Sequence, residues 1–256
     1  MQRNLLKINC EFESKKIVQF IKNTLKKQKI EKVVIGISGG IDSATSLYLL
    51  KNSVPLKNII TVTLPYFENQ LDGVQKLVKL IGLPDENFKI IPIKTMVDEI
   101  TKTLNVSDSD LVQKGNVMAR VRMITLYDLA KKKNALVCGT ENRSESLLGY
   151  FTRFGDEASD IEPIRHLYKT QVYELAKYLK VPQAIINKTP SANLWEGQTD
   201  ESQFNFTYAE ADQALYLYFD QKLTIEEIKK QGFKNAEKII DFAKKNSFKH
   251  NVPYSL

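Results

Sequence analysis

The sequence predicts an α/β fold in which helices cover both faces of a parallel sheet. Four short apolar runs, at 32–37, 58–65, 88–93 and 136–139, are rich in β-branched residues, which is typical of buried strands. Segments with helical spacing of apolar residues separate these runs, and strands that alternate with helices favour a parallel sheet. Right-handed crossovers between such strands place ligands at the carboxyl ends of the strands.

Helices are expected wherever apolar residues recur with a helical period between start and stop signals. The predicted ranges are 11–28, 42–50, 72–81, 96–104, 109–133, 168–179, 208–218, 224–230 and 235–245. The last three follow the sheet and predict extra C-terminal helices, one of which opens with a capping box at Thr224–Glu227. The polar stretches 139–169 and 189–201 lack this period and are expected to be loops, the first of them over a site.

The composition is that of an ordinary globular chain, and we expect residues 1–256 to form a single domain. Lys and Arg number 37 against 30 for Asp and Glu, but the lysines are spread along the chain as solvated helix ends, so no nucleic-acid partner is expected. Two cysteines without a CxxC pair exclude a zinc ribbon and a disulfide framework, and Cys138 lies in an apolar run typical of the core. No segment is apolar enough to span a bilayer, so a cytoplasmic protein without a membrane partner is expected.

The first strand leads into Ser38-Gly39-Gly40-Ile41-Asp42-Ser43, where a helix begins. Glycines let a ligand approach the backbone, and the free N–H groups of a first helical turn favour an anion. Asp42 would repel a bare phosphate, so a divalent cation between the two is expected. The spacing excludes both GxxxxGK[ST] and GxGxxG. A merely capped turn would need one polar residue and not this whole set.

Polar residues elsewhere add to this candidate anion site. Arg122 lies on an apolar stripe of the helix predicted at 109–133, where it either pairs with a phosphate or carboxylate or extends to solvent. Glu145, Asp156 and Asp160 follow the fourth strand and are either ligands for Mg²⁺ and a nucleophile or solvated surface acids. Lys169 stands at a helix start, where the dipole disfavours a cation, so it is either exposed or turned toward phosphate.

The loop at 38–43 resembles the SGGxDS loop of the PP-loop ATP pyrophosphatases, which cleave ATP between its α and β phosphates. Further motifs follow in the order found in the ammonia-dependent NAD synthetase family, and this ordered set is specific. The matching segments lie within 115–127, 139–145, 149–163, 167–172 and 190–201, so the resemblance covers nearly the whole chain. It implies a Rossmann-like fold of the adenine nucleotide alpha hydrolase type.

The resemblance also implies a reaction, the final step of NAD⁺ biosynthesis. In that family the carboxylate of deamido-NAD⁺ attacks the α-phosphorus of Mg-ATP, and ammonia then displaces AMP from the adenylate to give NAD⁺ and free pyrophosphate. Mg²⁺ and ATP as co-substrate, deamido-NAD⁺, ammonia and a homodimer are therefore expected. No glutaminase domain or suitable catalytic cysteine is present in the sequence, so free ammonia is the expected nitrogen donor, with an external glutaminase left open.

Site residues carried over by the resemblance fall into four groups according to their roles. ATP binding is implied for Ser38, Gly39, Gly40, Ile41, Asp42, Ser43, Thr140, Lys169 and Ser191. Deamido-NAD⁺ binding is implied for Arg122, Tyr127, Arg153, Asp156, Asp160 and Lys249. Asp42 and Glu145 are the implied metal ligands, and Asp42, Asp156 and Lys169 the implied catalytic residues.

Some positions depart from the family pattern. Arg153 stands where the family usually has Lys, which keeps the charge but replaces a point contact with a fork. Ser202–Asn205 replace a more acidic segment, and Phe248 stands where a His is common, with His250 as an alternative source of that contact. Two other functions stay open on sequence alone: a PP-loop enzyme acting on tRNA, and a non-catalytic ATP-sensing module.

Overall fold

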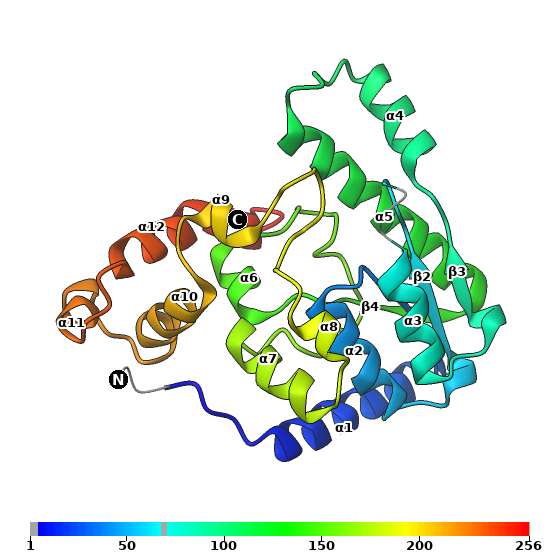
Figure 1. The fold of residues 1–256 in the computed structure, drawn as a ribbon, viewed down its shortest axis with the longest axis horizontal. Coiled ribbons are helices and arrows are strands. Elements are labelled where there is room, and N and C mark those ends of the chain that lie inside the picture. Colours follow the sequence, from blue (N-terminus) through cyan, green and yellow to red (C-terminus); the bar gives the residue numbers. More distant parts are fainter. Residues whose placement is uncertain (1–4, 68–70, 256) are drawn as a thin grey trace.

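A computed structural model describes residues 5–67 and 71–255, and its sheet is parallel, as predicted. Within the described residues the strands are β1 (Lys32–Gly36), β2 (Ile59–Thr63), β3 (Phe88–Ile90) and β4 (Ala135–Cys138), in the order β3-β2-β1-β4 (Figure 1).

β1 lies inside the sheet, where Val34 pairs with Ile60 of β2 on one side and with Val137 of β4 on the other. The chain first adds β2 and β3 on one side of β1 and only then adds β4 on the other. The order therefore reverses beside β1, and ligands of open parallel sheets bind at such a reversal. A parallel bridge between Cys138 and Ile161 extends the sheet just beyond β4.

Helices cover both faces of the sheet, because successive strand residues point to opposite sides. Val33 and Ile35 face a core built with one group of helices, whereas Val34 faces a second core. The first group is α1 (Cys10–Gln28), α2 (Ile41–Lys51), α3 (Asp72–Ile81), α7 (Lys169–Tyr178) and α8 (Gln183–Ile186). The second is α4 (Lys94–Thr103) and α5 (Leu111–Lys133). The predicted two-sided covering is confirmed.

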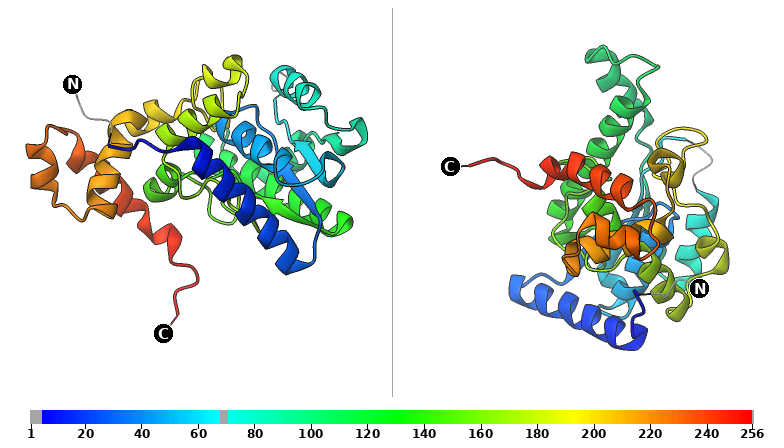
Figure 2. Two further views of the ribbon diagram at one scale, coloured as in Figure 1. Left: turned by 90° about the horizontal axis from the view of Figure 1, so that it is seen from below. Right: turned by 90° about the vertical axis from the view of Figure 1, so that its left-hand side faces the viewer.

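A third core belongs to the C-terminal helices, which gather at one end of the molecule beyond α6 (Arg143–Leu148) and α7 (Figure 1). These helices are α9 (Asp200–Phe204), α10 (Tyr208–Leu215), α11 (Ile225–Lys230) and α12 (Ala236–Asn246), with a π-helical turn at Tyr216–Asp220 after α10. Leu148 of α6 and Phe204 lie in this core and are almost completely buried. The last residues leave the helical layer as an extended tail (Figure 2).

Two stretches expected to be loops contain short helices, so that part of the prediction was wrong. α6 lies within 139–169 and α9 begins at the end of 189–201, while α8 was not predicted at all. Helices this short give no readable period. Side-chain caps support α6 and α9, and in α6 the Asn142 side chain accepts from the Glu145 N–H. β3 also ends at Ile90 and not at 93, and Pro92, just beyond it, has no N–H to donate.

Candidate active site

The loop between β1 and α2 has the predicted strand–turn–helix form. The Gly40 N–H donates to Ser38 Oγ at 3.2 Å, and the Ser43 hydroxyl donates to the Gly40 carbonyl at 3.1 Å. Gly39 has a φ of +74°, and a Cβ there would lie 3.3 Å from a Val74 methyl carbon. The loop is thus held by its own hydroxyl groups, and the first N–H groups of α2 remain directed at it.

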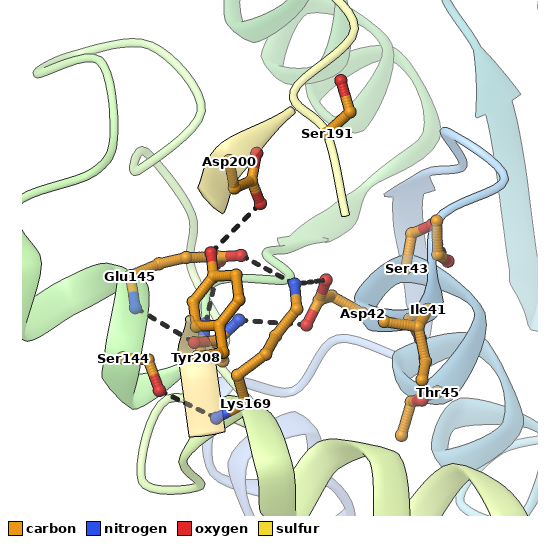
Figure 3. A network of polar contacts seen from close by, with 12 residues as sticks. Ile41, Asp42, Ser43, Thr45, Ser144, Glu145, Lys169, Ser191, Asp200 and Tyr208 are labelled. Carbon is orange, nitrogen blue, oxygen red and sulfur yellow. Dashed lines mark hydrogen bonds and ion pairs between the residues drawn. The ribbon is translucent and has the colours of Figure 1, made fainter. Parts of the chain in front are cut away.

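Lys169 is the centre of the site (Figure 3). Its Nζ lies 2.6 Å from Asp42 Oδ2 and 3.0 Å from Glu145 Oε1, and the residue is only 2% exposed. Asp42 comes from α2 after β1, and Glu145 comes from α6 after β4, so neighbouring strand ends bring the two acids together. Asn142 donates from Nδ2 to Asp42 Oδ1 at 3.0 Å. The ammonium is turned toward the interior, so the alternative of an exposed Lys169 was wrong.

Lys169 and the acids around it change one another's pKa values. Burial alone would lower the pKa of Lys169, but the carboxylates of Asp42 and Glu145 raise it, so the side chain stays an ammonium. Burial raises the pKa of Glu145, and the adjacent ammonium counteracts that shift. Separating these charges without replacing them would leave buried carboxylates uncompensated, which proteins avoid.

The start of α7 positions the Lys169 backbone. The Lys169 N–H donates to Ser144 Oγ at 2.8 Å, and the Thr170 N–H donates to Asp212 Oδ2 at 2.7 Å. The Ser144 hydroxyl in turn donates to Asp212, which is fully buried on α10. Burial raises the pKa of Asp212 to about 6. A C-terminal helix thus satisfies the free N–H groups of the helix that carries Lys169.

Sequence reasoning assigned no role to a third acid at the site, Asp200. Asp200 lines the same cleft, is 3% exposed, and accepts hydrogen bonds from Tyr208 at 3.0 Å and Tyr150 at 3.2 Å. The Lys169 Nζ lies 5.1 Å from the centroid of the Tyr208 ring. The only signal in the sequence was the position of Asp200 in the Thr199-Asp200-Glu201 part of a matching motif, which gives no partner for it.

Most of the predicted site residues line one cleft above the strand ends. They are Ser38, Gly40, Ile41, Asp42, Ser43, Arg122, Thr140, Glu145, Asp156, Lys169 and Ser191. Gly39 lines an adjoining cleft formed with α3, α8 and Trp195. The far side of the first cleft is apolar, with Leu64 after β2 and Leu126 of α5. The cleft therefore combines an anion-binding loop with a surface suited to a base or ring.

Arg122 and Asp156 both line this cleft, and each affects the pKa of the other. Arg122 Nε donates to the Leu64 carbonyl at 3.2 Å, and Asp156 Oδ1 accepts from the Thr152 N–H at 2.8 Å. Although the Asp156 carboxylate is open to the cleft, the protein crowded around it raises its pKa, and the charge of Arg122 counteracts this. Arg122 thus points into the cleft, so the alternative of a side chain extending to solvent was wrong.

Four predicted substrate contacts lie beside the described cleft and not in its lining. Asp160 Oδ2 accepts from the Val137 N–H at 2.7 Å, so it braces β4, and together with burial it raises the pKa of Tyr127. The Arg153 guanidinium lies over the Phe154 and Phe248 rings. Lys249 donates to two carbonyls, those of Gly149 and Phe151. Their roles in substrate binding stay predictions.

A family model described as NAD synthase matches residues 13–253. The chain belongs to the NAD synthase family. It is 38% identical to the NH(3)-dependent NAD(+) synthetase of Fusobacterium nucleatum over 98% of this chain and 97% of that one. The enzyme of the same name from Thermoplasma acidophilum is 43% identical over 95% of this chain and 97% of its own length.

Solved structures of other NAD synthase relatives have the same fold. The NH3-dependent NAD synthetase of Campylobacter jejuni, in complex with the nitrate ion, is 30% identical with a TM-score of 0.80, covering 98% of this chain and 100% of that one. The NMN synthetase of Francisella tularensis is 34% identical with a TM-score of 0.83, covering 98% and 99%. The predicted family and the predicted fold class are confirmed.

The donor set of this NAD synthase chain suits Mg²⁺. Among the described residues no group of three His, Cys, Asp or Glu side chains could hold a metal. Asp42 and Glu145 nevertheless direct one oxygen each at a single cationic atom, Lys169 Nζ. Mg²⁺ is commonly bound through one or two carboxylates together with substrate phosphates and water. Two converging carboxylates beside the 38–43 loop fit this mode of binding.

A second group of acids lies behind the end of β4. Glu162 Oε1 accepts from the Ser159 hydroxyl at 2.7 Å, and a Cβ at Gly139 would lie 1.9 Å from that oxygen, so only glycine fits there. Glu141 is 6% exposed, and its Oε2 lies 3.3 Å from Arg165. Burial raises the pKa of Glu141 to about 9, and the charge of Arg165 opposes this shift only in part. The only signal in the sequence was the position of Glu141 within the matching segment 139–145, which gives no partner for it.

Proposed function

We propose that this chain is an ammonia-dependent NAD⁺ synthetase, a ligase that forms a C–N bond at the expense of ATP. The observation that carries the proposal is the convergence of the 38–43 loop, Asp42, Glu145 and Lys169 on one cleft, in a chain that belongs to the NAD synthase family. The substrate would be the carboxylate of deamido-NAD⁺ and the products NAD⁺, AMP and pyrophosphate.

The chemistry begins with the carboxylate of the substrate, which is a poor acyl donor. Its oxygen attacks the α-phosphorus of ATP, and the bond from that phosphorus to the bridging oxygen breaks, releasing pyrophosphate. The Ser38 and Ser43 region and the N-terminus of α2 would hold the leaving phosphates, with Lys169 as a counter-charge. A bound Mg²⁺, held by Asp42 and Glu145, would neutralise further phosphate charge.

The second step transfers the acyl group to nitrogen. Ammonia attacks the acyl carbon of the adenylate, AMP leaves, and the nitrogen gives up one proton. We assign acceptance of that proton to Asp156, because its carboxylate is open to the cleft and its raised pKa suits a base. Arg122, which lines the same cleft, would hold substrate, and Thr140 and Ser191 would contact phosphates. The remaining predicted contacts, Tyr127, Arg153, Asp160 and Lys249, would meet parts of deamido-NAD⁺ outside the cleft.

The setting of the reaction is also a proposal. None of the described helices has both the length and the apolar character needed to cross a bilayer. We expect a cytoplasmic homodimer that acts without nucleic acid or membrane partners and uses free ammonia. Exposed apolar residues on α5, among them Ile124 at 58% exposure, support a protein–protein contact along that helix.

The direct test is a reaction containing ATP, Mg²⁺, the substrate and ammonium, in which NAD⁺ is measured through a coupled dehydrogenase. NAD⁺ should form only in the complete mixture, with equal amounts of AMP and pyrophosphate. If the folded protein binds ATP but makes no NAD⁺, the substrate assignment is wrong, and tRNA-dependent pyrophosphate release would be measured next. ATP binding without pyrophosphate release under any condition would favour a sensing module.

The likeness to an NMN synthetase favours a second candidate substrate, the mononucleotide with the same carboxylate. Both substrates carry the same reacting group, which would enter the cleft beside ATP in either case. Comparing kcat/KM for nicotinic acid mononucleotide and deamido-NAD⁺ separates the two. We expect the dinucleotide to be preferred, and a preference for the mononucleotide would reassign the product to NMN.

A further inference from the structure

The two proposed metal ligands are already engaged by other groups of the chain. Asp42 Oδ1 accepts from the Asn142 side chain, and Glu145 Oε2 accepts from the Asn142 N–H at 3.4 Å. The other oxygen of each acid contacts Lys169 Nζ. The two oxygens that converge on one point therefore converge on an ammonium, as Figure 3 shows. A divalent cation using those oxygens would have to stand where Nζ stands.

Two cations cannot share that position. An ammonium and a divalent ion held that close together in a site shielded from water repel each other strongly. We propose that Lys169 and a divalent cation are alternative partners of the Asp42–Glu145 pair, so that metal enters the pair only when a polyphosphate takes over the ammonium. This inference rests on the proposed binding of metal and ATP, and it adds the order in which the two can occupy the site.

The structure provides a path for this exchange. The Lys169 backbone is held by Ser144, so the flexible stem of the side chain is the part that can turn. Nζ borders the cleft that the 38–43 loop also lines, where phosphate oxygens would be within its reach. Asp200, fixed by two tyrosine hydroxyls, remains a nearby negative charge on the cleft side. The ammonium can therefore leave the pair without losing all its partners.

The exchange couples the two ligands. Metal alone must displace a buried ion pair, and polyphosphate alone must draw the ammonium away from two carboxylates. When both ligands bind, each lowers the free-energy cost of binding the other, and such coupling is reciprocal. Lys169 thus acts as a positioning residue for the metal as well as a phosphate contact.

The test measures binding of Mn²⁺ alone to the full chain by electron paramagnetic resonance, without nucleotide. Lys169→Met removes the competing ammonium, and we expect it to bind Mn²⁺ more tightly than the native chain, on the order of tenfold. The same variant should bind pyrophosphate more weakly. Lys188→Met is the matched control: Lys188 is exposed, lines the same cleft and takes no part in the ion pairs of Asp42 and Glu145. It should change Mn²⁺ affinity by less than about twofold.

The outcomes separate this inference from the proposed function. Unchanged or weaker Mn²⁺ binding by folded Lys169→Met overturns the exchange but leaves the metal site standing. If the native chain binds no Mn²⁺ even with pyrophosphate, the proposed metal site falls and the exchange falls with it. Should the variant not fold, a crystal structure of the native chain with Mn²⁺ and pyrophosphate decides. Nζ should then lie on phosphate oxygens, and Nζ still hydrogen-bonded to both carboxylates beside Mn²⁺ would refute the exchange.

Discussion

At the scale of single residues, the site depends on one ammonium that contacts two carboxylates from different elements. Asp42 is the member of this group that also lies in the 38–43 loop, proposed to bind phosphates. It therefore affects both the proposed metal and the position of Lys169. Asn142, which donates to Asp42, keeps its carboxylate oriented in the cleft.

Replacing Asp42 with Ala should lower kcat/KM for NAD⁺ formation by about 100-fold or more, because it removes the carboxylate proposed to hold the metal beside the reacting phosphates. Steady-state kinetics with saturating ammonium measure this loss. Asp85→Ala, an exposed acid at the start of a distant turn, is the control and should leave kcat/KM unchanged. Activity within a few-fold of native in Asp42→Ala would remove Asp42 from the mechanism.

The raised pKa of Glu141 predicts how the stability of the chain depends on pH. Its pKa in the folded chain is about 9, well above the ordinary value of 4.5, mainly because of burial. The folded state therefore holds a proton that the unfolded state has lost, and stability falls as pH rises from about 4.5 toward 9, by up to about 1.4 kcal/mol per pH unit. Above the pKa of the folded state, Glu141 is ionised in both states and its titration no longer lowers stability.

Glu141→Gln removes this titration. The variant should gain stability relative to the native chain as pH increases across that window, measured by urea unfolding at several pH values. Glu196→Gln, at an exposed acid, is the control and should give a constant difference. A difference for Glu141→Gln that does not vary between pH 5 and pH 9 would show that Glu141 is ionised in the folded chain.

At the scale of elements, α10 supports a helix that belongs to the site. Asp212 accepts from the Thr170 N–H and from the Ser144 hydroxyl, and Ser144 accepts from the Lys169 N–H. These contacts satisfy the first N–H groups of α7 inside the protein. The C-terminal layer is therefore part of what places Lys169, and not only an addition to the sheet.

Replacing Asp212 with Ala should destabilise the chain by about 2 kcal/mol, because it leaves buried N–H and hydroxyl groups without an acceptor. It should also lower kcat more than a general loss of stability explains, since the start of α7 carries Lys169. Denaturant unfolding and kinetics at 15 °C measure the two effects. Asp241→Ala, an exposed acid on α12, should change neither. A destabilised Asp212→Ala with native kcat would restrict Asp212 to a structural role.

At the scale of the whole molecule, α5 connects the cleft to the surface. Arg122 of this helix lines the cleft, whereas Ile124, two residues later, is exposed. A helix of 23 residues presents different faces to the core and to solvent, so one element can serve both the site and a contact with a second chain.

If α5 lies in the proposed dimer interface, Ile124→Glu should raise the dimer dissociation constant by roughly tenfold or more, because it buries a charge in an apolar contact. Analytical ultracentrifugation over a range of concentrations measures this. Lys131→Glu, an exposed change at the far end of the same helix, is the control. A native chain that is monomeric at every concentration would contradict the dimer itself.

The strand–turn–helix at the phosphate loop could be predicted from the sequence because its signals are local: an apolar run, two glycines and a helix start within about a dozen residues. The prediction from local signals failed in two places. It made β3 too long, because Pro92 just beyond the strand has no N–H to donate, and it missed α6, which side-chain hydrogen bonds cap. The parallel sheet could be predicted as well, because strands and helices alternate along the sequence.

The sequence by itself determined the family, the alternating fold and the acids and cations that the site would need. Only the tertiary structure decided their partners, because Asp42 meets Asn142 and Lys169 across 100 and 127 residues of chain, and no spacing rule links positions that far apart. It turned Lys169 inward onto two carboxylates, added Asp200 with its tyrosines, and placed Asp212 behind α7. These pairings arise because the strand ends meet at one edge of the sheet and a helical layer packs beside it. Burial then makes each charged group depend on its neighbour for compensation.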